Sequence, residues 1–466
     1  MPPARRPRVS SRKPPSSSAA AASGLRGGRG WLSAFRRDPA KRPRRADDDG
    51  TLLTDELLLV VFGGVPDLAD LVRCAATCRR WRRLVSSEAA FLCRTPRRPP
   101  GKFVGPLAVG FFHHQGDAAA AAPRFVPTAS ASRRFPGVLQ QPQPPSLSTL
   151  VDDGLFDGTS HIVASRNGLL VVDLRRGKHD RSLKLCVCNP MAGEVHVLPP
   201  LGGKDGLGYY ACTVLTAEDC DEKTIDPPRS SSYFRLVMVY TRRDFTAFRS
   251  YSSDDGSWSE EGKVTNSRLG KKQMGLTHSG VVDRGGRLVY WLAKNVVFVL
   301  CLETLQSVVV CNLPRSGNGQ KFDMANTLLG MSPEGMLCAV QFAQPLALRT
   351  TANPRRVSIR VTTCTEHRWW DTEELIQVEQ SLPADVTNVR LRWFCEKSGV
   401  VFFSIVAGDS DHRRREMYAL SLKSRVVEKL ASHDSDVDPW GHVHGYEMNQ
   451  TAYLASLAEP EGMEDM

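Results

Sequence analysis

The chain has 466 residues, a formal net charge of +11 at pH 7 and twelve cysteines. This length exceeds one ordinary domain and predicts two or more folded units. The charge is concentrated near the start, because residues 1–46 hold thirteen basic residues and one acidic residue, whereas the rest holds 48 basic and 49 acidic residues. The folded part is therefore nearly neutral, and the overall charge is no indication of nucleic-acid binding.

The cysteines show neither zinc-finger spacing nor a CxxC pair. Cys186 and Cys188 alternate within a predicted strand, which would place both on one face of a sheet. There is no secretory signal and no apolar run of about 18 residues. We therefore expect free thiols in a reducing compartment, with no membrane, no metal and no cofactor.

Residues 1–50 are predicted to be a disordered basic tail, since they are rich in Ala, Pro, Ser, Gly and Arg and have little to bury. A short basic cluster in this tail resembles a nuclear import signal and consists of Lys41, Arg42, Pro43, Arg44 and Arg45. A solubilising tail and an organelle transit peptide are the alternatives. The expected location is the nucleus, the cytoplasm or both.

Residues 51–95 are predicted to form three short helices. Thr54 can cap the first helix, whose first turn holds Asp55 and Glu56 and whose apolar residues are Leu57, Leu58, Val61, Phe62 and Val65. Gly63, Gly64 and Pro66 end that pattern. The second helix starts at Asp67 and carries the apolar stripe Leu68, Leu71, Val72, Ala75, Cys78, Trp81 and Val85. The third helix covers Glu88 to Cys93 after a cap at Ser87.

A module of about 45 residues seldom makes a sufficient core alone. Because the sequence of this module predicts no metal site or disulfide to stabilise it, its apolar residues are candidates for an interface with a second polypeptide. The alternative is an ordinary helical hairpin whose leucines are internal core.

The residue order of this module resembles the F-box. Leu53-Thr54-Asp55-Glu56-Leu57-Leu58 stands where F-boxes read Leu-Pro-Asp-Asp/Glu-Leu-Leu, and the second half matches at Leu71-Val72-Arg73-Cys74 and Cys78-Arg79-Arg80-Trp81-Arg82-Arg83-Leu84-Val85. Thr54 replaces the early proline of the family, so we expect a weaker contact at that corner of the interface while the leucine face is retained. The resemblance implies a Skp-type adaptor bound by Leu53, Thr54, Leu57, Leu58, Val61, Phe62, Val65, Leu71, Val72, Cys78 and Trp81.

Residues 96–150 are predicted to be a linker that is partly docked through two apolar patches, 103–112 and 125–126. His113 and His114 lie next to each other, but they have no third ligand nearby in the sequence, so we do not expect a metal there.

Residues 151–458 contain short β-branched runs bounded by turn residues, and residues 459–466 are a predicted disordered tail. Asn167-Gly168 predicts a hairpin within 160–173, and a second hairpin is predicted within 183–198. Looser copies of the same plan recur at 286–314 and 399–430. Such repetition predicts a β-propeller-like domain of about six or seven blades, in which neighbouring blades cover each other's faces.

This region also resembles the F-box-associated, Kelch-like propeller of plant F-box proteins. The matching residues are Ser165-Arg166-Asn167-Gly168-Leu169-Leu170, Cys188-Asn189-Pro190, Leu198-Pro199-Pro200, 252–258 and 285–292. The fold class expected for the whole chain is therefore a small three-helix F-box followed by a β-propeller-like repeat domain.

The sequence thus indicates a substrate-receptor subunit of an SCF-type cullin-RING ubiquitin ligase. It would reach cullin through the adaptor, recruit an unknown protein substrate and contribute no catalytic residue. One alternative is a propeller-pocket enzyme that uses the polar cluster Asp434, Asp436, Asp438, His442 and His444. Others are an F-box protein that acts outside a ligase and a nucleic-acid binder that depends on the basic tail; nucleic acid is not an expected partner.

Overall fold

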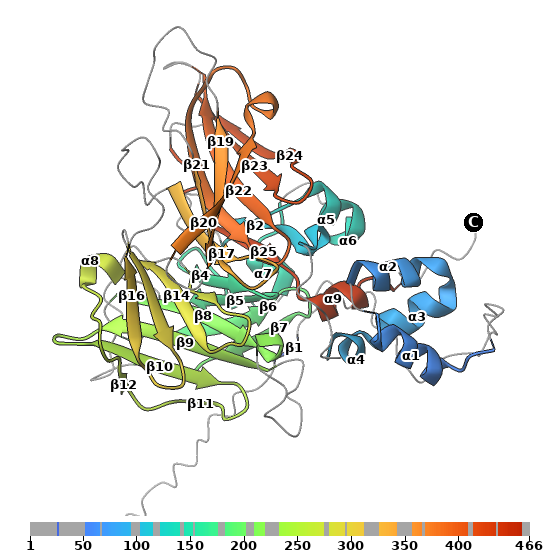
Figure 1. Cartoon of the computed structure of the whole chain (residues 1–466), viewed down its shortest axis with the longest axis horizontal. Coiled ribbons are helices and arrows are strands. Elements are labelled where there is room, and N and C mark those ends of the chain that lie inside the picture. Colours follow the sequence, from blue (N-terminus) through green and yellow to red (C-terminus); the bar gives the residue numbers. More distant parts are fainter. Residues whose placement is uncertain are drawn as a thin grey trace, which may run out of the picture.

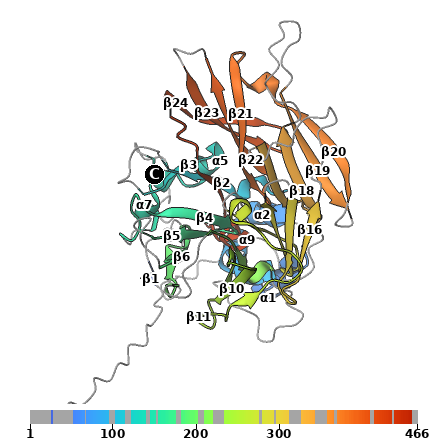
Figure 2. The same ribbon diagram turned by 90° about the vertical axis from the view of Figure 1, so that its left-hand side faces the viewer.

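The computed structural model describes residues 26–27, 52–65, 68–94, 103–114, 122–139, 144–151, 154–175, 182–201, 209–219, 233–274, 279–293, 296–311, 326–342, 357–365, 369–408, 413–434 and 437–458. Four N-terminal helices, the helical module, lie beside six antiparallel sheets that form a propeller (Figures 1 and 2). The predicted fold class, a short helical domain followed by a β-propeller, is confirmed, and the number of blades is six.

The helical module consists of α1 (Asp55–Gly63), α2 (Leu68–Thr77), α3 (Arg79–Ser87) and α4 (Ala89–Arg94). The Thr54 side chain accepts a hydrogen bond from the amide of Leu57, which confirms the predicted N-cap. Gly64 closes the C-terminus of α1. No helix among the described residues is both long and apolar enough to cross a membrane.

The prediction of one helix from Leu68 to Val85 is wrong, because the chain breaks at Cys78. Cys78 is extended, with φ −154° and ψ 167°, and its Sγ accepts a hydrogen bond from the amide of Trp81 at 3.4 Å. A side chain that bonds to the backbone three residues later starts a new helix. The last helix also starts later than predicted, at Ala89, since Glu88 closes α3. Asp67, the predicted start of the second helix, lies outside the described residues.

The propeller blades are listed here from the innermost strand outward. Blade 1 consists of β4 (His161–Arg166), β5 (Leu169–Asp173), β6 (Leu185–Asn189) and β7 (Glu194–Val197). Blade 2 consists of β8 (Tyr210–Thr216), β9 (Phe234–Thr241), β10 (Thr246–Ser252) and β11 (Ser257–Trp258), and β12 (Gly262–Lys263) also pairs with β10. Blade 3 consists of β13 (Val281–Val282), β14 (Leu288–Ala293), β15 (Val296–Cys301) and β16 (Ser307–Cys311). Blade 4 consists of β17 (Thr327–Met331), β18 (Leu337–Phe342), β19 (Ser358–Thr365) and β20 (Trp369–Gln377). Blade 5 consists of β21 (Val386–Cys395), β22 (Val400–Ala407), β23 (Arg414–Ser421) and β24 (Val427–Asp434). Blade 6 consists of β25 (Val443–Glu447), β2 (Ala108–His113) and β3 (Arg124–Pro127).

Short helices connect or cover these strands. They are α5 (Ala129–Arg134), α6 (Pro136–Leu139), α7 (Leu147–Val151), α8 (Lys271–Met274) and α9 (Gln450–Ala455), with 3₁₀ turns η3 (Gly105–Leu107), η5 (Ala217–Asp219) and η8 (Glu379–Ser381).

The predicted hairpins are confirmed. β4 and β5 pair in antiparallel fashion across a turn in which Asn167 and Gly168 have φ 50° and 81°, as a two-residue hairpin turn requires. β6 and β7 form the second hairpin, and the copies in blades 3 and 5 also pair as predicted.

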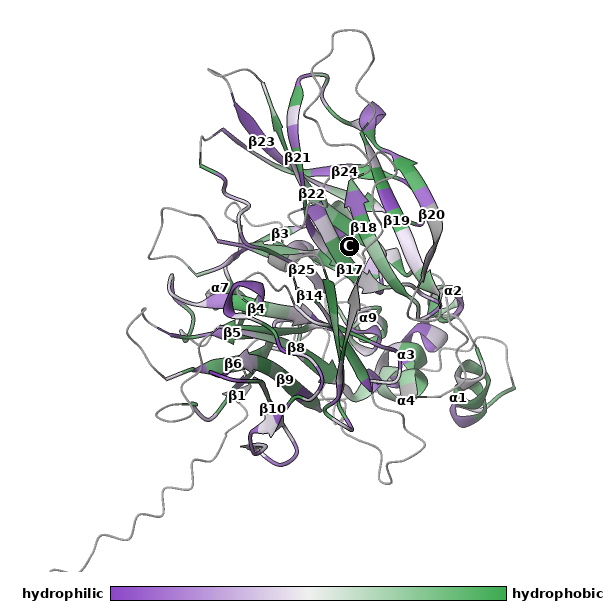
Figure 3. Cartoon of the chain, turned by 60° about the vertical axis from the view of Figure 1, so that its left-hand side comes forward, coloured by the Kyte–Doolittle hydropathy of each residue, from purple (hydrophilic) through white to green (hydrophobic). Residues whose placement is uncertain are grey.

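The apolar side chains form clusters between neighbouring blades. In β6, Cys186 and Cys188 face one cluster, while Leu185 and Val187 face another that is shared with blade 2. This alternation confirms that both cysteines lie on one face and that adjacent blades bury each other's surfaces. Figure 3 shows hydrophobic colour on many of the blade strands and on α1, with hydrophilic segments between.

Blade 6 closes the ring with strands from both ends of the described propeller. β25 pairs with β2, and β2 pairs with β3, so the propeller begins inside the segment 96–150 that was predicted as a linker. All six residues of β2 are buried. Within the predicted tail, Arg26–Gly27 form β1 and pair with Val195 and Glu194 at the outer edge of blade 1. Backbone hydrogen bonds of this kind need no apolar side chains.

Helix α9 fastens the helical module to blade 6. It directly follows β25, Asn449 caps it by accepting a hydrogen bond from Ala452, and it contacts α3 and α4. Figure 1 shows α9 between the module and the propeller. Tyr453 and Leu454 belong to the same buried cluster as Leu58 of α1. The module and the closing blade therefore share one apolar core.

The inner strand of blade 6 has no room for a side chain at one position. A Cβ at Gly445 would lie 2.4 Å from Cδ1 of Trp393 and 2.9 Å from Sγ of Cys395. We predict that Gly445→Ala lowers the free energy of unfolding by about 1–3 kcal/mol, because overpacking forces neighbouring groups to move. Urea or thermal unfolding measures the loss. Gly441→Ala is the matched control, because its Cβ would find its nearest neighbour at 3.8 Å; equal losses in the two variants would contradict the prediction.

Candidate partner-binding ridge and propeller channel

Four apolar residues on the outer side of the helical module are exposed, and we call them the apolar ridge. They are Leu53, Leu57, Val60 and Val61, with exposed fractions of 43, 52, 68 and 55%. Their spacing places them along one face of α1 and the residues before it. Phe91 of α4 is also half exposed. An apolar strip of this kind on a small module is a feature of binding surfaces.

The opposite face of α1 packs inward, which corrects part of the predicted interface. Leu58, Phe62 and Leu71 are buried in the chain's own core, so they are not free to contact a partner. Val65, Val72 and Trp81 are partly buried against the same core. The physical reason is that α1 is apolar on nearly all sides, so its sequence periodicity could not show which face turns inward.

Two further predicted interface residues have structural roles in the module. Thr54 and Cys78 are both N-caps, although Thr54 is itself exposed. Sequence reasoning missed Val60, which is the most exposed member of the ridge. The continuous apolar run through α1 was the signal that could have identified it.

Arg80 holds the start of the ridge in place. Its Nε donates to Oδ1 of Asp55 at 2.9 Å, and its Nη2 donates to the carbonyl of Leu53 at 2.6 Å. These bonds connect α3 to the N-terminus of α1. The backbone of Leu53 is thereby held at the N-terminus of α1.

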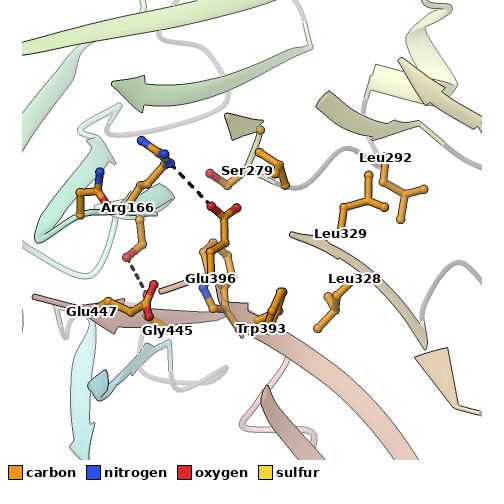
Figure 4. A pocket seen from close by; sticks show the side chains of 14 residues that line it. Arg166, Ser279, Leu292, Leu328, Leu329, Trp393, Glu396, Gly445 and Glu447 are labelled. Atoms are coloured by element: carbon orange, nitrogen blue, oxygen red, sulfur yellow. Dashed lines mark hydrogen bonds and ion pairs between the residues drawn. The ribbon is translucent and has the colours of Figure 1, made fainter. Parts of the chain in front are cut away.

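A pocket lies where the innermost strands of the propeller converge (Figure 4). It has an empty volume of about 720 Å³, including the space at its open mouth. Its lining comes from β4, β13, β14, β17, β21 and β25 and from residues that flank these strands. Three leucines, Leu292, Leu328 and Leu329, face the charged residues Arg166 and Glu396 across the pocket. Trp393 and Phe394 complete the apolar part.

Arg166 forms the charged centre of the pocket. Its Nη1 and Nη2 donate to the two carboxylate oxygens of Asp219 at 2.5 and 2.7 Å, and Nη1 also donates to the carbonyl of Val214 at 3.3 Å. This bidentate pair joins blade 1 to the end of the first strand of blade 2. Burial acts to raise the pKa of Asp219, but the charge and hydrogen bonds of Arg166 outweigh it, so the net effect is a lowered pKa.

Two carboxylates line the pocket itself, and they differ in their hydrogen-bond partners. Glu447 accepts hydrogen bonds from the amides of Ser398 at 2.6 Å and Lys397 at 3.4 Å. Glu396 forms an ion pair with Nε of Arg166 at 3.9 Å, which is too long for a hydrogen bond. Burial, aided by the nearby charges of Glu447 and Asp219, raises the pKa of Glu396 to about 7 although Arg166 opposes the shift.

The polar cluster considered for acid/base chemistry does not gather at this pocket. Asp438 binds Arg392 at 2.6 Å, His444 packs against Trp393, and Asp434 is exposed at the end of β24. His442 is exposed, and Asp436 lies outside the described residues. Within the described part of the chain, no three His, Cys, Asp or Glu side chains are arranged to hold a metal ion. The basic cluster 41–45 also lies outside the described residues.

Residues 125–407, more than half of the chain, match the family model described as "Domain of unknown function (DUF7595)". The chain belongs to the DUF7595 family. In addition, residues 55–95 match an F-box-like model, which covers the helical module. This DUF7595 protein therefore carries an F-box-like domain, as its residue order predicted. Among curated proteins, none matches it.

Solved structures similar to this DUF7595 protein are remote in sequence. They include a prolyl endopeptidase at 14% identity, covering 60% of this chain and 50% of the other, with TM-score 0.28. An oligogalacturonate lyase from Vibrio parahaemolyticus matches at 9% identity, covering 60 and 79%, with TM-score 0.31. An α-L-arabinofuranosidase from Fusarium graminearum matches at 10% identity, covering 71 and 86%, with TM-score 0.32. The aligned part of this chain spans half the length of the prolyl endopeptidase.

His113, in β2, predicts a sensitivity of the fold to acid. Burial lowers its pKa from 6.5 to about 4, despite a hydrogen bond with the backbone of Pro439 that raises it. The unfolded chain binds a proton at higher pH than the folded one, so stability falls as the pH drops from about 6.5 towards 4. We expect this residue to contribute up to about 3 kcal/mol of that loss.

Chemical denaturation at a series of pH values measures this effect. His113→Phe keeps an aromatic ring beside Phe111 and Trp440 but cannot titrate, and it should flatten the pH dependence in this window. His442→Gln, at an exposed histidine, is the control and should leave the slope unchanged. An unaltered slope in His113→Phe would show that another group is responsible.

Proposed function

We propose that this protein is a substrate-receptor subunit of an SCF-type cullin-RING ubiquitin ligase. The observation that carries the proposal is the apolar ridge on an F-box-like domain. F-box domains generally bind Skp-type adaptors, and a helical module with four exposed apolar side chains on one face fits that role. Cullin would be reached through the adaptor.

The ridge is a plausible interface because it is both apolar and fixed. The Thr54 cap and the Arg80 bonds hold its N-terminal end, and Leu58 and Phe62 anchor the inner face of α1. A surface that is already ordered loses little conformational entropy when a partner binds. The interface therefore needs no rearrangement of α1.

In this proposal the propeller recruits a protein target and the chain supplies no catalytic group. A receptor that holds its target near the ubiquitin-charged enzyme raises the effective concentration of the reacting lysine. Helix α9 supports this role, because it joins the module to blade 6 through a shared core. A Kelch-like plant F-box protein in the nucleus, the cytoplasm or both is the finer form of the proposal.

We predict that Leu57→Asp combined with Val61→Asp weakens binding of a purified Skp-type adaptor by at least about 10-fold. Each change puts a charge on the exposed ridge, where desolvation on binding is costly, while the core stays intact. Size-exclusion chromatography and calorimetry with the full chain measure the loss. Leu58→Asp is unsuitable for this test, because Leu58 is 1% exposed and a buried charge would unfold the module.

The matched control is Leu375→Asp combined with Val426→Asp, which adds the same charges at exposed apolar positions of blades 4 and 5. This control should bind the adaptor as tightly as the unaltered chain. Retained adaptor binding by the ridge variant, with circular dichroism showing a folded protein, would refute the proposed interface.

A further inference from the structure

The pocket where the innermost propeller strands converge, the channel pocket, combines an apolar wall with a carboxylate that has no hydrogen-bond donor among the described residues. Arg166 is occupied by Asp219, and Glu447 by backbone amides, but no described residue donates a hydrogen bond to the carboxylate of Glu396. Figure 4 shows Glu396 at the pocket, across from Leu328 and Leu329. The Glu396 side chain is 19% exposed, and a carboxylate that is largely removed from water and has no donor gains free energy when a ligand donates to it.

The charges around the pocket favour a cation over an anion. Asp219, Glu218, Glu396 and Glu447 are acidic, and only Arg166 and Lys397 are basic among the groups that act on Glu396 or its ion pair. Lys397 is itself paired with Glu218. The guanidinium fork of Arg166 holds both oxygens of Asp219, so the positive charge of Arg166 is already balanced by that carboxylate. A cation would instead offset the local excess of negative charge.

The apolar wall defines the rest of the ligand. Leu292, Leu328 and Leu329 form an aliphatic surface opposite the carboxylate, and Trp393 adds an aromatic one. Phe394 packs so closely on β17 that a Cβ at Gly330 would lie 2.1 Å from its Cδ1. The pocket therefore has a closely packed apolar wall, with the carboxylates of Glu396 and Glu447 away from that wall.

We propose that this pocket binds an ammonium or guanidinium group carried on an aliphatic chain, with Glu396 as the acceptor and the leucines against the chain. Lysine and arginine side chains of a protein and free aliphatic amines share this chemistry. Such a site would give the propeller a means of selecting a target. The inference does not depend on adaptor binding, and its failure would leave the ligase proposal intact.

The test uses the full chain and measures binding by calorimetry and thermal shift. The probes are n-pentylammonium chloride and the peptide acetyl-Gly-Lys-Gly-amide, compared with n-pentanol, hexanoate and the peptide with norleucine in place of lysine. We expect both cationic probes to bind at least about 10-fold more tightly than their uncharged or anionic counterparts, as a hydrogen bond to a charged group implies. This comparison needs no variant, so it stands even if a substitution impairs folding.

Glu396→Gln should weaken binding of the cationic probes by about 10-fold or more. Glu260→Gln, at an exposed position in the loop after β11, is the control and should leave their affinity unchanged. Binding should also strengthen from pH 6 to pH 8 as Glu396 loses its proton beside Arg166, Asp219 and Glu447. Binding of the free amine without the peptide would support the pocket and assign it to small amines. Equal affinity for uncharged probes, preference for hexanoate, or unchanged binding in Glu396→Gln would overturn the inference.

Discussion

The pairing of β2 with β25 is the constraint on which the rest of the structure depends. It joins strands that are more than 300 residues apart and turns a row of six sheets into a closed ring. Ser165 of blade 1 donates to the carbonyl of Gly445, and Tyr446 donates to the carbonyl of Gly168, so the seam is also bonded to the next blade. Closure leaves only short, protected inner edges. The closing strand β25 lines the pocket and is followed by α9, which contacts the helical module.

The sequence predicted those parts of the fold that depend on local patterns. The Asn167-Gly168 turn, the alternation of Cys186 and Cys188, and the Thr54 cap involve neighbours within a few residues, and each is confirmed. Ring closure is a long-range contact, and β2 and β3 carry no local sign that their partner lies at the far end of the chain. The break at Cys78 was missed because a cysteine cap leaves the apolar stripe uninterrupted.

The candidate sites were harder to predict for a related reason. Apolar residues surround α1, so spacing alone could not distinguish the exposed Leu57 from the buried Leu58. The pocket carboxylates come from separate blades, and Arg166 appeared only as part of a turn motif. Their convergence depends on the ring, since Glu396 and Glu447 lie about 50 residues apart and Asp219 lies in another blade. A cluster dense in the sequence, such as Asp434 to His444, proved to be spread over separate contacts.

The position of α9 has a consequence for biosynthesis. The helical module is synthesised before the propeller strands β4 to β25, whereas Tyr453 and Leu454, which belong to the same core, are synthesised after them. The module cannot finish packing until residues 450–455 are released. Packing of the helices that carry the apolar ridge is therefore coupled to synthesis of α9, and a nascent chain without α9 would present these helices without the part of their core that Tyr453 and Leu454 supply.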